Sequence, residues 1–354
     1  MSLNEQDLEF EQDDSAEVLY ERMSWVVDKG QEPMRIDKWL VGRIENASRN
    51  KVQIAIDNAR VLVNGKQVSA NHKIKPGEEI IVYSDKEVHG EEIVPEPMPL
   101  NIVFEDDDIL IIHKRVGLVV HPASGNPNGT LINGVAHYLL QQNKDLTAET
   151  LPRFGLVHRI DKNTSGLMVL AKTPKAASSL AKQFFDHSIH RQYVALVWGD
   201  VAEDEGTIEA HVGRHQRFRK IFDAYPDGEI GKEAITHYKV LERFGYVTLI
   251  QCELETGRTH QIRVHMKSIG HPLFNDELYG GDRIVKGTVF TKYKQFVENC
   301  FALCPRHALH AKTLGFIHPT TGKKVEFNSE IPEDMSSVIE KWRKYVKFKS
   351  INND

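Results

Sequence analysis

Cysteine is scarce in this sequence, and long apolar runs are missing. Only three of the 354 residues are cysteine, which excludes a disulfide scaffold and favours a reducing compartment. No apolar run approaches the ~20 residues that a membrane-spanning helix needs. The chain opens on acidic residues, unlike the basic and apolar start of a signal peptide. We therefore expect a cytoplasmic protein that does not enter a membrane.

Motifs for cofactors are also missing. The sequence contains neither the GxxxxGK[ST] pattern nor the GxGxxG pattern that cradles phosphates. The spacing of Cys300, Cys304, His307 and His310 is too short for the common zinc finger, which has about a dozen residues between its ligand pairs. We therefore expect no nucleotide cofactor and no metal site.

The charge of the chain is unevenly distributed. Residues 1–22 hold eight acids and one base, a charge of −7 against −5 for the whole chain, so residues 23–354 carry +2. We interpret residues 1–22 as an acidic, disordered tail. The whole chain is 40% hydrophobic and 27% charged, which is enough to build a core. The mild basic excess of residues 23–354 is compatible with a polyanionic partner.

The first structured region has the pattern of two short helices followed by a hairpin. Apolar residues recur at helical spacing in residues 35–45, and Ser48 is a plausible N-cap for a second helix. Asn64-Gly65 follows an apolar triplet, which is typical of a tight hairpin turn. Residues 80–83 predict a further strand.

This region carries nine bases and five acids between Arg35 and Tyr83. Charge alone would suit a solvated face as well as a phosphate-binding one. The stretch MRIDKWL…SRNKVQIAIDNARVLVNGKQV also resembles the S4 RNA-binding domain, over about 50 residues, which favours RNA. The candidate RNA contacts are Arg35, Lys38, Arg49, Lys51 and Arg60.

The rest of the chain is strand-rich. Pro95, Pro97 and Pro99 alternate with other residues, which favours an extended linker. A mixture of strands and helices without strict alternation predicts an α+β fold around a mixed, largely antiparallel sheet with flanking helices. We expect strands at 102–104, 109–112, 193–198 and 246–254, and helices at 131–142, 175–185 and 335–348.

The expected domains are a tail at 1–22, an S4-like domain at 23–90, a linker at 91–100, a large domain at 101–330, and a helix and tail at 331–354.

A single carboxylate stands out in the segment FGLVHRIDKNTSGLMVLAKT. Asp161 lies among His158, Arg159 and Lys162, and nearby cations favour the ionised form of a carboxyl group. Such a group suits a nucleophile or an electrostatic partner better than a general acid. The alternative is a turn residue that binds its own backbone.

Two further segments hold candidates. If QCELETGRTHQIRVH is a strand, Arg263 shares a face with Gln261 and His265, and a buried arginine needs a carboxylate partner such as Asp161. The alternative is a surface strand with dispersed bases. Tyr193 begins an apolar strand, where a phenol could stack on a base, although a core tyrosine is the more common finding.

The blocks HRIDKNTSGLMVLAK, RQYVAL, TGRTHQIRVH, GHPLFND and RHALHA occur in this order. They resemble the signature blocks of the RluA/RluD-type pseudouridine synthases, the branch that acts on large ribosomal RNA and has an N-terminal S4 domain. The resemblance covers residues 24–330. It implies that uridine is isomerised to pseudouridine in RNA without a cofactor.

The resemblance also implies roles for individual residues. Asp161 matches the catalytic aspartate, Tyr193 the active-site tyrosine, Arg263 the arginine that pairs with the aspartate, and Arg159 the residue that fills the gap left by a flipped nucleotide. Attack on the sugar, attack on the base and assisted elimination all remain compatible with these residues. Further candidate substrate contacts are His158, Arg258, Arg214, Arg217, Arg219 and Lys220.

The expected partner is RNA, in particular 23S ribosomal RNA or its large-subunit precursor, and we expect a monomer. A glycosidase with paired carboxylates is disfavoured because no second carboxylate is evident beside Asp161. The other alternative is a non-catalytic RNA-binding protein in which the S4 unit acts and the large domain is a scaffold.

Overall fold

The chain folds as two units, Met1–Glu92 and Ile93–Asp354. The computed structural model describes residues 20–44, 49–84, 93–123, 126–147, 150–218, 221–288 and 290–351. No helix in these ranges is long and apolar enough to cross a membrane.

The first unit is a small antiparallel sheet with two short helices. The sheet has the strand order β1-β4-β2-β3. The predicted hairpin turn is present, because Asn64 and Gly65 both adopt positive φ angles of 48° and 73° between β2 and β3. The elements are β1 (Tyr20–Val26), α1 (Ile36–Val41), α2 (Arg49–Asp57), β2 (Val61–Val63), β3 (Lys66–Gln67) and β4 (Glu79–Ser84). The predicted N-cap Ser48 lies outside the described residues.

Strand β1 corrects the predicted extent of the acidic tail. Tyr20 and Glu21 pair with β4, and the strand runs on to Trp25, whose ring meets Trp39 edge-on. The expected tail at 1–22 therefore overlaps a strand by three residues, while residues 1–19 lie outside the described part. The prediction rested on the local acidic composition. The strand forms because β4, more than fifty residues later in the sequence, pairs with it.

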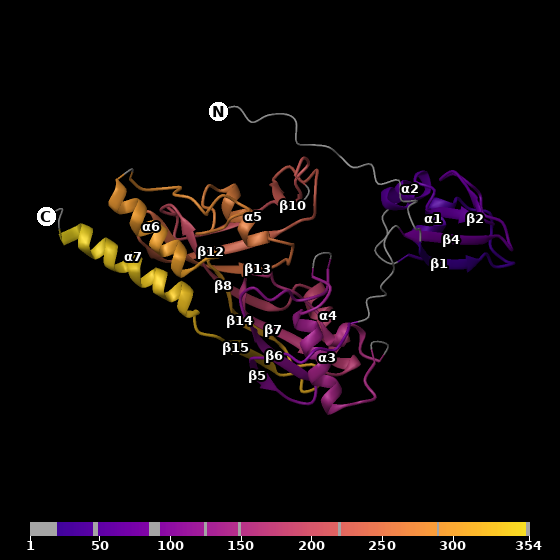
Figure 1. Ribbon diagram of the computed structural model, residues 1–354, viewed down its shortest axis with the longest axis horizontal. Helices are drawn as coiled ribbons and strands as arrows, with labels where there is room; N and C mark the ends of the chain where they lie inside the picture. Colours follow the sequence, from indigo (N-terminus) through magenta and orange to yellow (C-terminus); the bar gives the residue numbers. More distant parts are fainter. Residues whose placement is uncertain are drawn as a thin grey trace, which may run out of the picture. The chain divides into compact units, whose positions relative to one another are not determined.

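The second unit is built on a nine-stranded sheet with the order β5-β6-β7-β14-β8-β13-β12-β9, and β15 pairs with β14 (Figure 1). Within the described residues, β7 and β14 are parallel and the other neighbours are antiparallel. The predicted mixed, largely antiparallel sheet is confirmed. Its strands are β5 (Ile102–Glu105), β6 (Ile109–Lys114), β7 (Ser165–Ala171), β8 (His190–Trp198), β9 (Glu205–Glu209), β12 (Ile235–Arg243), β13 (Val247–Leu254), β14 (Leu309–Ile317) and β15 (Lys324–Asn328), and a separate hairpin contains β10 (His211–Arg214) and β11 (Phe222–Tyr225).

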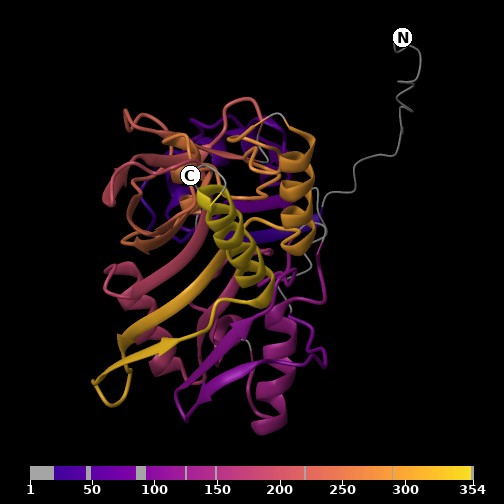
Figure 2. The same ribbon diagram turned by 90° about the vertical axis from the view of Figure 1, so that its left-hand side faces the viewer.

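Helices cover both faces of this sheet. Leu110 and Met168 cluster with α3, whereas their neighbours Ile109 and Val169 cluster with α4. Successive strand residues point to opposite faces, so these helices lie on opposite sides. Helices α6 and α7 lie side by side and share a third cluster with alternate residues of β8 (Figures 1 and 2). The helical elements are α3 (Leu131–Gln142), η1 (Pro152–Gly155), α4 (Pro174–Phe185), α5 (Gln261–Ser268), α6 (Thr291–Leu303) and α7 (Glu333–Ile351).

Helix α5 overturns one sequence prediction. We expected residues up to His265 to continue as a strand, but Gln261–Ser268 is helical and His260 reverses the chain with φ of 59°. Six consecutive residues of the helix, Gln261 to Met266, are buried. A helix buried all round has no apolar stripe, so the alternating Ile262, Val264 and Met266 imitated a strand.

The parallel pair β7–β14 places the start of β7 close to a neighbouring backbone. Gly166 has φ of 119°, and a Cβ there would lie 2.1 Å from the Ala311 carbonyl oxygen. A side chain would force these strands apart, so glycine is required at this point. The loop that precedes β7 therefore sits beside the start of β14.

Candidate active site

Asp161 lies in a loop whose backbone carbonyl groups accept several hydrogen bonds. The Thr164 N–H donates to the Asp161 carbonyl oxygen at 3.1 Å, which closes a turn. The next carbonyl, that of Lys162, accepts hydrogen bonds from Lys114 Nζ at 3.0 Å and from the Gly117 N–H at 2.9 Å. The Asp161 side chain is still 21% exposed, so its carboxylate faces open space while its backbone is fixed.

Arg263 binds two carboxylates at once. Its Nη1 donates to Asp161 Oδ2 at 3.0 Å, while Nε and Nη2 donate to the two oxygens of Asp276 at 2.7 and 2.8 Å. Asp276 is fully buried. Burial opposes the charge on Arg263, but the hydrogen bonds to Asp276 and the attraction of both carboxylates raise its pKa above the usual value. The guanidinium is therefore permanently charged and held in one orientation.

A histidine, His260, lies next to this pair and is neutral. His260 Nε2 lies 3.9 Å from Asp161 Oδ2, and its Nδ1 lies 2.7 Å from the Tyr279 hydroxyl. Burial lowers the pKa of His260, and the positive charges of Arg263 and Arg159 lower it further against the pull of Asp161. Arg263 is thus the charged partner of Asp161, and His260 is a neutral neighbour.

Asp161 lines two adjoining cavities of about 480 and 730 Å³. Among the described residues, Arg263 donates a hydrogen bond to Oδ2 of this carboxylate, and His260 lies 3.9 Å from the same oxygen. Both cavities are within the size range of small-molecule sites. They share a wall formed by Arg159, Ile160, Asp161, Gly257, Arg258, His260 and Arg263.

Tyr193 lines the smaller cavity from β8. Its side chain is 8% exposed, and burial raises its pKa above the usual value. The phenol is therefore neutral, with an apolar ring beside Leu254 and Ile262 in the same wall. The structure brings this predicted residue to the same cavity as Asp161.

Arg159 and Arg258 line both cavities. Arg159 is exposed, and its Nη2 donates to Thr259 Oγ1 at 3.2 Å. Arg258 is half-buried, and its Nε donates to the Glu233 carbonyl oxygen at 2.9 Å. Each guanidinium keeps donors that a phosphate could accept from.

His158 has a different environment from the other predicted contacts. Its Nε2 accepts a hydrogen bond from the Val169 N–H at 3.0 Å, and its ring stacks on Phe184 with centroids 4.5 Å apart. Burial lowers the pKa of His158 to about 3, so the ring is neutral at pH 7. The structure shows it joining the Asp161 segment to β7 and α4, and its contact with a substrate stays a prediction.

The basic loop after β10 is only partly described. Arg214 lies 5.2 Å from the centre of the Phe222 ring, and Arg217 lies 5.4 Å from that of Phe218. Phe218 is 56% exposed. The Tyr279 hydroxyl accepts from the Phe222 N–H at 3.1 Å, which ties the hairpin to the His260 side of the site. The predicted contacts Arg219 and Lys220 lie outside the described residues.

In the first unit, a buried carboxylate holds two of the predicted RNA contacts. Asp37 accepts from Arg35 Nη2 at 2.9 Å and from Arg49 Nε at 3.1 Å. The hydrogen bond from Arg35 is the main reason that the pKa of Asp37 falls well below its usual range. Lys38 is exposed on α1, Lys51 lies on α2, and Arg60 precedes β2.

Sequence reasoning missed three residues that support the site. Asp276 and Arg306 lie in the blocks GHPLFND and RHALHA, and each is a buried charge within an otherwise mostly apolar stretch. That contrast was the available signal. Lys114 had none, because a lysine at the end of a strand is ordinarily exposed. His307 and His310, weighed as zinc ligands, bind the side chains of Thr164 and Ser165 at 2.9 Å each.

Comparisons with known proteins show the family to which the chain belongs. Residues 108–268 match the family described as RNA pseudouridylate synthase, and residues 34–80 match the S4 domain. The chain therefore belongs to the RNA pseudouridine synthases, which are isomerases, and its S4 domain places it with the RluD-type members of that family. The resemblance seen in the sequence is confirmed.

The relatives match along most of the chain. An "Uncharacterized RNA pseudouridine synthase" of Chlorobaculum parvum is 45% identical and is covered to 98%, with 91% of this chain aligned. "Ribosomal large subunit pseudouridine synthase D" of Escherichia coli is 38% identical and is covered to 94%, again with 91% of this chain aligned. A solved structure, "Human RNA Pseudouridylate Synthase Domain Containing 4", has a TM-score of 0.55 at 23% identity, covering 69% of this chain and 93% of that one, and it supports the fold.

Proposed function

We propose that this enzyme converts specific uridines to pseudouridine in large-subunit ribosomal RNA, 23S or its precursor, with Asp161 as the catalytic carboxylate. The observation that carries the proposal is the Asp161–Arg263 ion pair at the wall of two joined cavities. The choice of RNA is supported by the relatives named ribosomal large subunit pseudouridine synthase D. Such a substrate would place the enzyme in the cytoplasm.

The reaction is an isomerisation, so the protein must supply contacts and charge but no oxidant or transferred group. The bond between ribose C1′ and uracil N1 breaks, the ring turns, and C1′ bonds to C5. The C5 proton is lost and N1 gains a proton, which balances the equation. Asp161 would provide the negative charge next to the nucleoside, and Arg263 would orient it through its hydrogen bond to Oδ2.

The target nucleotide must leave its stack to reach Asp161, at a cost of a few kcal/mol. Arg159 is exposed at the shared wall of the cavities, where its planar guanidinium would stack in the gap that the nucleotide leaves. Tyr193 would receive the face of the uracil ring within the smaller cavity. Both roles follow from position and chemistry together.

An exposed aromatic ring adds a further contact. Phe185 lines the smaller cavity although its side chain is 82% exposed. Its neighbour Phe184 turns inward and packs on His158. A ring left in water at the edge of an RNA site suits stacking on a base next to the flipped uridine.

The S4 unit would supply affinity through phosphates. Asp37 fixes Arg35 and Arg49 in place, and both remain 39% and 51% exposed, so they present pre-oriented guanidinium groups. Lys38 adds an exposed charge on the same helix as Asp37. These side chains would bind the phosphate groups of the RNA, and such contacts do not distinguish one base sequence from another.

The experiment is to map pseudouridines in ribosomal and transfer RNA from cells with and without the protein, and to restore the cells with wild-type or Asp161→Asn enzyme. We expect one or more large-subunit sites to be lost without the protein, restored by the wild type and absent with Asp161→Asn. The purified variant should still bind RNA. Changes confined to transfer RNA would overturn the substrate assignment, and full activity of Asp161→Asn would overturn the catalytic one.

A further inference from the structure

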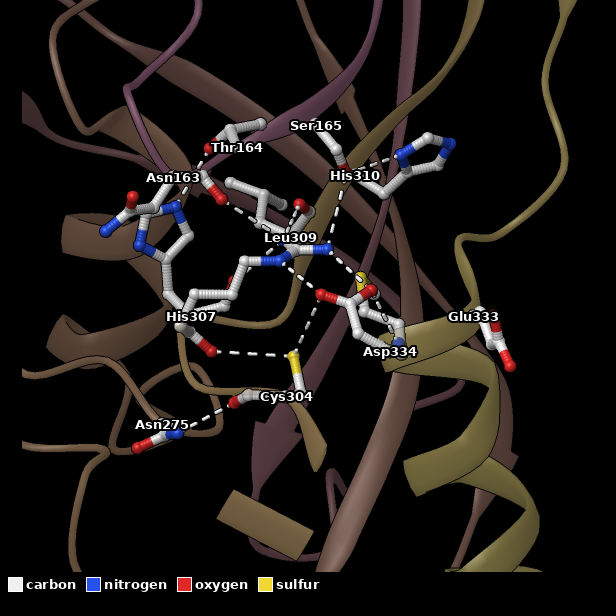
Figure 3. A network of polar contacts seen from close by, with 12 residues as sticks. Asn163, Thr164, Ser165, Asn275, Cys304, His307, Leu309, His310, Glu333 and Asp334 are labelled. Atoms are coloured by element: carbon white, nitrogen blue, oxygen red, sulfur yellow. Dashed lines mark hydrogen bonds and ion pairs between the residues drawn. The ribbon is translucent and has the colours of Figure 1, made fainter. Parts of the chain in front are cut away.

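A buried arginine joins the catalytic loop to the C-terminal helix. The side chain of Arg306 is 1% exposed. Its Nε and Nη2 donate to the two oxygens of Asp334 at 2.7 and 3.1 Å, and Asp334 is the second residue of α7. Arg306 also donates to Asn163, Ser165 and Leu309, and these three residues and Asp334 are labelled in Figure 3.

The other donors of Arg306 bind the loop that carries Asp161. Nη1 donates to the Asn163 carbonyl oxygen at 3.2 Å, and Nη2 donates to Ser165 Oγ at 3.3 Å. Nη1 also donates to the carbonyls of His307 and Leu309 at 3.1 and 2.8 Å, next to β14. One side chain therefore fixes the loop, the start of β14 and α7 relative to one another.

Other contacts also support the loop between Asp161 and β7. His307 and His310 bind the side chains of Thr164 and Ser165, and Lys114 binds the carbonyl of Lys162. The two histidines lie within four residues of Arg306 in the sequence, whereas Lys114 comes from β6. If Arg306 shifts, the histidines that hold the loop shift with it.

Charge explains why Asp334 controls the position of Arg306. A buried guanidinium needs a carboxylate, and its remaining hydrogen bonds from the described residues end on carbonyls and one hydroxyl. The Asp334 carboxylate is held in turn by the first turn of α7, where the Met335 N–H donates to Oδ1 at 2.8 Å. Without that carboxylate, Arg306 would be drawn toward water and away from Asn163.

We propose that Arg306 and Asp334 are a positioning pair through which α7 sets the geometry of the loop that carries Asp161. The inference rests on the proposed role of Asp161. It gives the C-terminal helix, which lies beyond the matched residues 108–268, a part in catalysis without contact to the substrate. The pair acts on the rate of the chemical step, because a displaced carboxylate loses its alignment with the nucleoside.

The chain offers a matched control on the same helix. Arg343 of α7 binds Glu242 of β12 with nitrogen–oxygen distances of 2.6 to 3.0 Å. This pair also fastens α7 to the sheet but has no bond to the loop. Glu242→Gln therefore weakens the attachment of the helix without touching Arg306, whereas Asp334→Asn removes the charge from the proposed pair.

The test compares single-turnover rates of pseudouridine formation, RNA dissociation constants and melting temperatures for the wild type and both variants. We expect Asp334→Asn to lower the single-turnover rate by about tenfold or more, with RNA affinity within about twofold. Asp334→Glu, which restores a carboxylate, should recover part of the rate. Glu242→Gln should keep the wild-type rate to within about twofold.

Several results would overturn the proposal. A folded Asp334→Asn enzyme with the wild-type rate would do so, and so would an equal loss of rate in Glu242→Gln. If Asp334→Asn does not fold, Ser165→Ala takes its place, since it removes the bonds of this loop residue to Arg306 and His310. An unchanged rate in that variant counts against the pair. The proposed catalytic role of Asp161 fails separately, through an active Asp161→Asn enzyme.

Discussion

Arg263 Nη1 and Asp161 Oδ2 lie 3.0 Å apart, although 102 positions separate the two residues in the sequence. Asp161 comes from the loop before β7, and Arg263 comes from α5. Nε and Nη2 of the same guanidinium donate hydrogen bonds to the two carboxylate oxygens of Asp276. Asp276 therefore fixes the orientation of the guanidinium that binds Asp161.

Replacement of Arg263 by lysine should reduce turnover far more than RNA affinity. Lysine keeps the charge but has no planar fork, so it cannot bind Asp161 and both oxygens of Asp276 together. We expect turnover to fall by about a hundredfold and the RNA dissociation constant to change by less than about threefold. Single-turnover kinetics and RNA titration measure the two quantities.

Arg243→Lys is the control for this prediction. Arg243 binds the Val201 carbonyl oxygen and Asp204, away from the cavities, so its substitution should leave turnover near the wild-type value. Equal losses of turnover and affinity in Arg263→Lys would count against a specific pairing with Asp161.

Replacement of Phe185 by alanine should weaken RNA binding. The ring is 82% exposed at the cavity, and stacking on a base is worth about 1–3 kcal/mol, so we expect the dissociation constant to rise roughly tenfold. The melting temperature should hardly change, because little packing is lost. Phe290→Ala is the matched control, since Phe290 is 72% exposed and does not line either cavity. Equal affinities of the two variants would refute the stacking role.

Replacement of Lys38 by glutamine should change the salt dependence of RNA binding. Lys38 is exposed on α1 beside the Asp37 cluster, and a lysine that contacts a phosphate releases a counterion on binding. We expect the slope of log affinity against log salt to fall in magnitude by about 1. Titrations at several salt concentrations measure this slope. Lys29→Gln, another exposed lysine of the same unit, should leave it unchanged, and the prediction fails if both slopes match the wild type.

Acid should destabilise the second unit through His310. Its ring is fully buried, with Nδ1 bound to Ser165 and Nε2 bound to Ser329. Burial lowers the pKa of His310 to about 3, and the positive charges of His113 and Arg306 act in the same direction. Between about pH 6.5 and pH 3 the unfolded chain takes up a proton that the folded protein does not, so stability is lost as the pH falls through this window.

The loss attributable to His310 between pH 7 and pH 5 should be roughly 2 kcal/mol in the free energy of unfolding. His310→Gln removes this term, so its stability should depend less steeply on pH, even though the variant starts from a lower value at pH 7. Urea denaturation at both pH values measures the difference. His137→Gln, on α3, should retain the wild-type steepness, and an equal pH dependence in His310→Gln would contradict the assignment.

Several features were predictable from the sequence because their causes are local. The turn at Asn64-Gly65 follows from two residues that tolerate positive φ. Helix α3 was expected at residues 131–142, which it occupies, and apolar residues recur there at helical spacing. The family also followed from the sequence, since its motif blocks are short and contiguous. The basic neighbours of Asp161 left a turn residue as an alternative, and the resemblance supplied the catalytic role that we propose.

Other features depended on contacts between distant segments. Helix α5 is buried on all sides, so its apolar spacing carried no information about its type. Strand β1 exists because β4 is there to pair with it. A local sequence pattern reflects only the residues adjacent along the chain. The structure of these two elements depends on residues that are adjacent in space but distant in the sequence.

The sequence by itself determined which family this chain belongs to, because the motif blocks are contiguous, and through that resemblance it named Asp161 as the proposed catalytic carboxylate. The tertiary structure decided what holds that carboxylate. The sheet order brings β7 beside β14, and this places Arg263, Asp276 and Arg306 around a loop more than a hundred positions earlier in the chain. Buried charges are stable only when their partners and hydrogen bonds are complete, and that condition can be met only by the folded chain.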